Sequence, residues 1–163
     1  MAVQNAKDVL LLMLSDVRRG SERSANFFKE VVPMVQDPDV KQTLEARAFI
    51  SAKNLETLDQ CFKLLGEKPV KLDGRIYETF VEDFRNQLGE IQSPVAKRLF
   101  ILSKINHLIH LRMGEYAALV AAAEATGNHG VGALLETNLA DKHVFGDRVR
   151  RFIRERREAG AAA

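Results

Sequence analysis

The chain has 163 residues and a mass of 18.3 kDa; 46% of the residues are apolar, 28% are charged, and the formal net charge is +2. This composition is typical of one globular domain, so we expect a single domain over residues 1–163 with a frayed tail over 158–163. It excludes wholesale disorder and collagen-like repeats. A membrane span is also excluded, because the apolar run Val9–Leu14 is far shorter than the roughly 20 residues required. The small net charge makes no case for a nucleic-acid partner.

The single cysteine, Cys61, excludes an internal disulfide framework and a four-thiolate zinc site. The first residues lack the small-residue cleavage pattern of a signal peptide, and we therefore expect a cytoplasmic protein. Cys61 lies near the end of a predicted helix, where the helix dipole disfavours a thiolate. We interpret it as a small buried hydrophobic residue.

The first two predicted helices are separated by only a few residues. The first covers residues 6 to about 36, and Pro33 marks its kinked or frayed last turn. Asp37–Pro38 reads as an N-cap and first-turn proline, and Gly66 ends the second helix, residues 38 to about 65. The predicted buried stripe of the first helix is small and polar in its middle: Leu10, Leu14, Val17, Ser21, Ser24 and Phe28.

Three more helices follow. A short amphipathic helix covers residues 76 to 88 and stops at Gly89. Ser93–Pro94 caps a long helix over residues 94 to 126, and the last helix covers about 131 to 158. The buried stripe predicted for the long helix is Leu99, Leu102, Asn106, Ile109, Met113, Tyr116 and Val120.

These lengths predict the topology. The first two long helices are joined by a very short connection, as are the last two, so each pair must form an antiparallel hairpin. The segment between the two hairpins is long enough to return the chain to its starting end. We therefore predict an all-α, ferritin-like four-helix bundle made of two antiparallel hairpins and a long crossover, with a fifth short helix in the crossover.

Three segments also resemble a known family. QCFKLLGEKP at residues 60–69, YAALVAAAEATG at 116–127 and LLETNL at 134–139 are similar to motifs of the YciF-like family of small bacterial ferritin-superfamily proteins. That resemblance implies a bundle that dimerises and holds a carboxylate–histidine metal pair at its centre. Aligned from these turns, the family's ligand positions carry residues that mostly cannot bind a metal: Ala25, Arg47, Ile50, Ile109, Arg112 and Lys142.

We conclude that the implied metal site is dismantled, since only His110 and Asp141 remain as donors and a di-iron centre needs about six ligands. If Arg47 or Arg112 enters the core it needs a buried acidic partner, for which Asp141 is the candidate. The alternative, which we narrowly prefer, is that both arginines point outward. A relocated site for zinc or another divalent ion would have to draw on His107, His110, Asp141 and His143.

A basic segment near the C-terminus could bind an anionic partner. We prefer to interpret its charges as complementing the helix dipole, because Val149, Phe152 and Ile153 lie between them. The arginines concerned are Arg148, Arg150, Arg151, Arg154, Arg156 and Arg157.

The function we expect is that of a non-enzymatic, cofactor-free and metal-free structural or stress-associated protein. The stress association is implied by the resemblance alone. We expect a homodimer that contacts its partner through Phe80, Val81 and Phe84, with no membrane and no nucleic acid, while an unidentified protein partner stays open. A metal-dependent oxidoreductase or iron-binding protein with a displaced site is the first alternative. An adaptor that uses the C-terminal arginines is the second.

Overall fold

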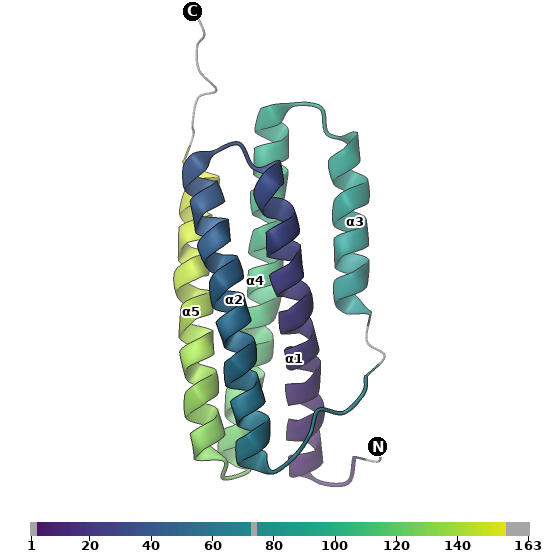
Figure 1. Ribbon diagram of the computed structural model, residues 1–163, viewed down its shortest axis with the longest axis vertical. Coiled ribbons are helices and arrows are strands. Elements are labelled where there is room, and N and C mark those ends of the chain that lie inside the picture. Colours follow the sequence, from purple (N-terminus) through teal and green to yellow (C-terminus); the bar gives the residue numbers. More distant parts are fainter. Residues whose placement is uncertain (1–2, 73–74, 156–163) are drawn as a thin grey trace, which may run out of the picture.

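The computed structural model describes residues 3–72 and 75–155, and Figure 1 shows a bundle of four long helices with a shorter helix along one side. No strand occurs within the described residues. The predicted all-α fold of two antiparallel hairpins and one long crossover is confirmed. The elements are α1 (Ala6–Val31), a 3₁₀ turn η1 (Val32–Met34), α2 (Pro38–Leu65), α3 (Ile76–Glu90), α4 (Pro94–Ala125) and α5 (His129–Arg154).

The helix ends follow local signals in the sequence. The Asp37 carboxylate accepts hydrogen bonds from the first backbone N–H groups of α2, and Gly66 ends that helix in the left-handed region at φ 68°. Pro33 lies in η1, as expected of a frayed last turn. The expectation that Gly89 stops α3 is wrong by two residues, because the helix continues to Glu90.

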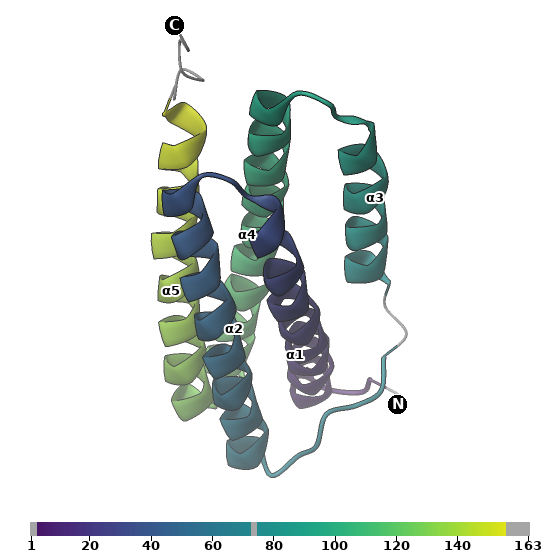
Figure 2. The ribbon, with the colours of Figure 1, turned by 45° about the horizontal axis from the view of Figure 1, so that its top comes forward.

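Each long helix contacts two others. α1 lies against α2 and α4, α5 lies against the same two helices, and the two remaining pairs are diagonal. α3 covers the outer side of α1 and α4 and forms part of the crossover between α2 and α4 (Figure 2). Arg19 fastens this crossover to α1, because it donates to the Leu72 carbonyl and to the Glu78 carboxylate.

The prediction that Phe84 is exposed on α3 is wrong. Phe84 is fully buried, and its ring packs edge-on against Phe27 with centroids 4.9 Å apart. Phe80 and Val81 are partly buried against the same apolar cluster. The apolar face of α3 therefore packs mainly against its own bundle.

The core consists of two apolar clusters along the bundle axis. One contains Phe28, Phe84 and Phe145, and the other contains Leu58, Phe62 and Leu119. Leu99, which we had placed on the buried stripe of the long helix, is instead 52% exposed. None of the described helices is long and apolar enough to span a lipid bilayer.

Candidate functional site

A layer of buried polar side chains lies between the two apolar clusters. All four long helices contribute to it, which places it at the level where the family resemblance implied a metal pair. Its members are Ser21 and Ser24 on α1, Arg47, Ser51 and Asn54 on α2, Arg112 on α4, and Asn138 and Lys142 on α5.

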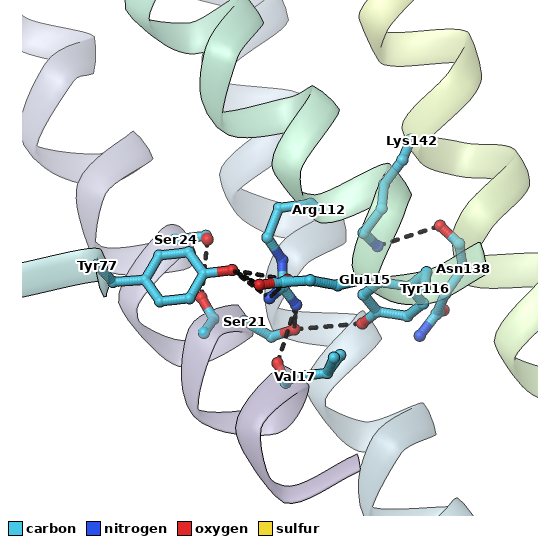
Figure 3. A network of polar contacts seen from close by, with 10 residues as sticks. Val17, Ser21, Ser24, Tyr77, Arg112, Glu115, Tyr116, Asn138 and Lys142 are labelled. Carbon is cyan, nitrogen blue, oxygen red and sulfur yellow. Dashed lines mark hydrogen bonds and ion pairs between the residues drawn. The ribbon is translucent and has the colours of Figure 1, made fainter. Parts of the chain in front are cut away.

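Arg112 is the centre of a hydrogen-bond network that joins three helices (Figure 3). Its Nη1 donates to the Tyr77 hydroxyl at 2.6 Å and to the Glu115 carboxylate. Its Nη2 donates to the Val17 carbonyl at 2.9 Å and to the Ser21 hydroxyl. The guanidinium therefore binds α1, the crossover helix α3 and its own helix α4 at one point.

The partners of Arg112 are themselves satisfied. The Tyr77 hydroxyl donates to both oxygens of Glu115, at 2.8 and 2.7 Å. Burial raises the pKa of Tyr77 above its ordinary value, and it also raises the pKa of Glu115 although Arg112 acts in the opposite direction. Burial disfavours the charge of Arg112 too, but Tyr77 and Glu115 more than compensate, so the pKa of Arg112 is raised.

Gly20 makes room for this network. A Cβ at this position would overlap the Tyr77 ring at Cε2 and would lie 2.5 Å from Arg112 Nη1. A side chain of any size would therefore force the network to move. Gly20 is thus a packing requirement of the site, even though glycine is a poor residue for the middle of a helix.

Lys142 lies beside the Tyr116 ring and donates to Asn138 (Figure 3). Only 1% of the residue is exposed; its ammonium donates to the Asn138 carbonyl at 3.1 Å and lies 3.7 Å from the centre of the Tyr116 ring. Burial lowers the pKa of Lys142 well below its ordinary value, and the charges of Arg47 and Arg112 lower it further.

Arg47 is also buried, with 4% exposed, but its hydrogen bonds are incomplete. Its guanidinium lies over the rings of Phe145 and Phe28, with the guanidinium carbon 5.2 and 5.9 Å from the ring centroids. Nε and Nη1 of Arg47 have no hydrogen-bond partner, and neither has Ser51 Oγ on the same helix. Burial lowers the pKa of Arg47 to about 10, so the group is still charged at neutral pH.

The preferred expectation that both arginines point outward is therefore wrong. The structural reason is helical spacing: Arg47 follows Leu44 by three residues and Arg112 follows Ile109 by three, so both share the face that faces the core. The acidic partner is also a different one. Arg112 is paired with Glu115, whereas Asp141 is half-buried and acts on Arg47 only through its charge.

The residues at the implied ligand positions do not fit a pair of iron ions. Ala25 and Ile109 are buried, Ile50 is half-buried, and none of the three has a donor atom. The remaining positions hold the buried cations Arg47, Arg112 and Lys142, which would repel Fe²⁺. The histidines lie elsewhere: His107, His110 and His143 are exposed, and His110 Nδ1 is 2.7 Å from the Asn106 carbonyl of its own helix. No three acidic, histidine or cysteine side chains in the described part of the chain are grouped as metal ligands.

The basic segment near the C-terminus belongs to the surface. Its four described arginines are exposed; Arg150 pairs with Asp147, and the guanidinium of Arg148 lies over the Phe152 ring. Between them Val149 and Phe152 are buried, as predicted from their spacing. Arg156, Arg157 and the tail 158–163 lie outside the described residues.

The sequence analysis missed Tyr77, Glu115 and Gly20 as parts of the site. Glu115 follows Arg112 by three residues on the same helix, and that spacing is a usable signal of an ion pair. Tyr77 carried no such signal, since it lies on the crossover helix. The interpretation of Cys61 as buried is confirmed, and burial raises the pKa of its thiol to about 11.

Known structures share this fold. YcfI from Rhodopseudomonas palustris, provisionally described as a structural protein, superposes with a TM-score of 0.87 at 24% sequence identity, over 91% of this chain and 94% of that one. The stress protein YciF from E. coli superposes with a TM-score of 0.87 at 16% identity, over 93% and 96%. A protein from Xanthomonas campestris superposes with a TM-score of 0.70 at 16% sequence identity, over 90% of this chain and 89% of that one. At these identities the likeness establishes the fold alone. No curated protein sequence matches the chain.

The chain belongs to the family described as Domain of unknown function (DUF892), whose sequence profile matches residues 5–162. Its structural neighbours include YciF itself, so the resemblance to the YciF-like group that we drew from three short motifs is confirmed.

Proposed function

We propose that this DUF892-family chain is a non-enzymatic, metal-free and dimeric structural or stress-associated protein of the cytoplasm. The E. coli neighbour is named a stress protein, and the R. palustris neighbour carries a provisional structural description; both support the class of function. The lone buried thiol of Cys61 suits a reducing compartment.

The observation that carries the proposal is the set of buried cations at the implied metal positions. Ferrous iron is held by oxygen-rich, negatively charged sites, and two ions need about six such ligands. Here Glu115 is a half-buried carboxylate beside the layer, and both of its oxygens are already engaged by Tyr77 and Arg112. The donor set is therefore the opposite of what the metal needs.

The same contacts indicate what the layer does instead. Arg112 ties α1, α3 and α4 together through hydrogen bonds to Val17, Ser21, Tyr77 and Glu115. A metal pair would also join helices through the bundle centre. The arginine provides that connection with groups of the chain alone, so no metal ion is needed to join these three helices.

Iron loading tests the metal-free part of the proposal. Apo-protein is exposed to Fe²⁺ without oxygen and desalted; iron per chain is then measured, and oxygen uptake is followed on admitting air. We expect iron well below one ion per chain and no uptake above buffer. A folded variant with Ala25→Glu, Arg47→His, Ile50→Glu and Ile109→Glu is the matched positive control. Tight binding of one or two ions by the wild-type chain, lost in His110→Ala or Asp141→Ala, would favour the displaced-site alternative.

Because Phe84 is buried, we place the dimer contact on a surface other than α3. The most exposed large apolar side chains on the adjacent helices α2 and α5 are Phe49, 63% exposed, and Val144, 71% exposed. The Asn54–Asn138 contact sets the register of this antiparallel pair. Five residues further along the pair, Phe49 therefore lies at the level of residue 143, next to Val144 in the chain. We expect light scattering to give about twice the chain mass of 18.3 kDa, and Phe49→Ser to lower it, whereas Leu64→Ser at the helix end leaves it unchanged. A monomeric wild-type protein at all accessible concentrations contradicts the dimer.

A further inference from the structure

The polar layer has two halves that differ in how well their charges are compensated. In the half around Arg112 every partner is bonded, and Glu115 supplies a counter-charge. In the half between α2 and α5, the Arg47 guanidinium lies over two ring faces, its Nε and Nη1 have no hydrogen-bond partner, and Asp141 acts on it only through its charge. Ring faces offset part of the cost of burying a cation, but they accept no hydrogen bond from the in-plane N–H groups.

The unpartnered donors lie on one face of one helix. Arg47, Ser51 and Asn54 are spaced by four and three residues on α2, and each has a buried nitrogen or oxygen without a hydrogen-bond partner: Arg47 Nε and Nη1, Ser51 Oγ, and Asn54 Nδ2. All three residues are more than nine-tenths buried. Buried donors without acceptors are rare in folded proteins because each costs about 1–3 kcal/mol.

The facing helix adds a further cation at the same level. Asn138 Nδ2 of α5 donates to the Asn54 carbonyl at 3.4 Å, and the Arg47 guanidinium lies over Phe145 two turns further along. Between these two contacts, Ser51 is the inward residue of α2 and Lys142 is the inward residue of α5. The Lys142 ammonium has three N–H groups, of which one is used on Asn138.

We propose that the α2–α5 half of the layer binds one small inorganic anion of about the size of chloride, held by Arg47, Ser51 and Lys142. The anion supplies the negative charge that Arg47 lacks and the acceptor that Ser51 and the free N–H groups require. Asn54 lies at the edge of this site and completes the row of donors. The charge of this site is opposite to that of the metal pair that the family resemblance implied.

The size limit follows from the packing. Two surface cavities of about 680 and 520 Å³ are lined by other residues, chiefly at the end of the bundle around Met34 and Ile101. The four donor residues are enclosed by helices and by the rings of Phe28, Tyr116 and Phe145. We therefore limit the proposed ligand to a single-atom anion, because these four residues are almost completely buried.

Bromide serves as the probe for position. Crystals of the full chain grown in sodium bromide, free of chloride, are measured at the bromine absorption edge. We expect one anomalous peak within hydrogen-bond distance of Arg47, Ser51 and Lys142. A peak only on the protein surface means an adventitious ion only and overturns the proposal, as does a water in this place with no anomalous signal.

Chloride titration tests the same site in solution. Thermal unfolding is followed at constant ionic strength while gluconate is replaced by chloride. Because a ligand of the native state stabilises it in proportion to ln(1 + [L]/Kd), the midpoint should rise by about 3–6 °C for each tenfold increase in chloride above Kd. Arg47→Met and Lys142→Met should abolish this dependence, whereas the exposed control Lys53→Met should keep it.

Two outcomes would refute the solution prediction. The first is that wild-type protein unfolds at the same temperature in chloride and gluconate. The second is that Arg47→Met or Lys142→Met keeps the full chloride dependence, which would place the ion on the surface. If Arg47→Met fails to fold, Lys142→Met and the bromide crystals decide the question. Neither result depends on iron binding, so the proposal stands or falls separately from the proposed function.

Discussion

Replacing Gly20 by alanine separates the contribution of the Arg112 network from ordinary helix propensity. In most helix interiors, Gly→Ala stabilises the protein by about 0.5–1 kcal/mol, because alanine loses less backbone entropy on folding. At Gly20 the new Cβ would overlap the Tyr77 ring and crowd Arg112 Nη1. The two effects have opposite signs, so the sign of the measured change decides between them.

The magnitude can be worked from the contacts. Overpacking of a tight core costs about 1–3 kcal/mol. Displacing Tyr77 or Arg112 also weakens the 2.6 Å hydrogen bond between them. A hydrogen bond to a charged group contributes about 1.5–3 kcal/mol to stability. After subtracting the helix gain, we expect Gly20→Ala to destabilise the protein by about 2–4 kcal/mol. For a chain of this length that lowers the unfolding midpoint by roughly 4–16 °C.

Gly114→Ala is the matched control, because Gly114 is also inside a long helix and a Cβ there would contact nothing within 4 Å. We expect it to stabilise the protein by about 0.5–1 kcal/mol. Both variants are compared with wild type by urea denaturation, followed by circular dichroism at 222 nm. If Gly20→Ala is as stable as wild type or gains stability as the control does, the close packing of Gly20 against the network is refuted.

Two further changes probe the charged layer. Arg112→Met should destabilise the protein by about 3–5 kcal/mol in urea denaturation, because it leaves Glu115 and the Val17 carbonyl without this donor. In the double variant with Glu115→Gln, the loss of stability should be smaller than the sum of the two single losses. Lys142→Met should leave stability unchanged or raise it by about 1–4 kcal/mol in gluconate buffer, since the native state holds an ammonium whose pKa is lowered.

The pH dependence of the Lys142→Met effect has a definite sign. Between the lowered pKa of Lys142 in the folded protein and 10.5, the unfolded chain binds more protons, so wild-type stability rises with pH over this window. The gain from the methionine should therefore be largest below the window and vanish above it. The charges around Lys142 are Arg47 and Arg112, which lower its pKa, and Asp141 and Glu115, which raise it, with the Tyr116 ring against its ammonium. A gain that does not vary with pH would mean that Lys142 is not the titrating group.

The helices were predictable because their ends are coded locally. Asp37 and Pro38 start α2, Gly66 ends it, and Ser93 caps α4 before a first-turn proline, so both hairpins could be placed to within a few residues. The topology then followed from lengths alone, since a connection of that size between hairpins has room to run back along the bundle. These signals depend on neighbouring residues and need no knowledge of the tertiary structure.

The orientation of the buried cations was predictable in part. The spacing of Arg47 from Leu44 and Ser51, and of Arg112 from Ile109 and Tyr116, already placed both on the inward face. Residue type argued against that placement, because arginine is almost never fully buried unless it is paired. The pairing depends on Tyr77, which reaches Arg112 only because α3 packs across α1 and α4, and no local pattern encodes such a contact.

The small polar stripe of α1 makes sense once this contact is known. Ser21 accepts a hydrogen bond from Arg112, and the Ser24 hydroxyl donates to the Gly20 carbonyl of its own helix. Both side chains are small, so they leave room beside α1 for Tyr77 and Arg112. Large apolar residues at these positions would fill the space that the guanidinium uses. The unusual residues of three helices are thus explained by one buried side chain.

The charge balance of the layer connects the proposals on metal and anion. A metal pair brings positive charge to a bundle centre that supplies carboxylates, and this chain supplies the positive charge itself, from Arg47, Arg112 and Lys142. Glu115 balances Arg112, so the charge of Arg47 still needs compensation in a region of low dielectric constant. Burial and the neighbouring cations lower the pKa of Lys142, whereas Arg47, with a pKa of about 10, keeps its charge at neutral pH. A bound anion resolves this imbalance without a second acidic residue. It also predicts the relation between the two tests: a centre that takes up bromide should not take up Fe²⁺, because one arrangement of donors cannot favour both charges.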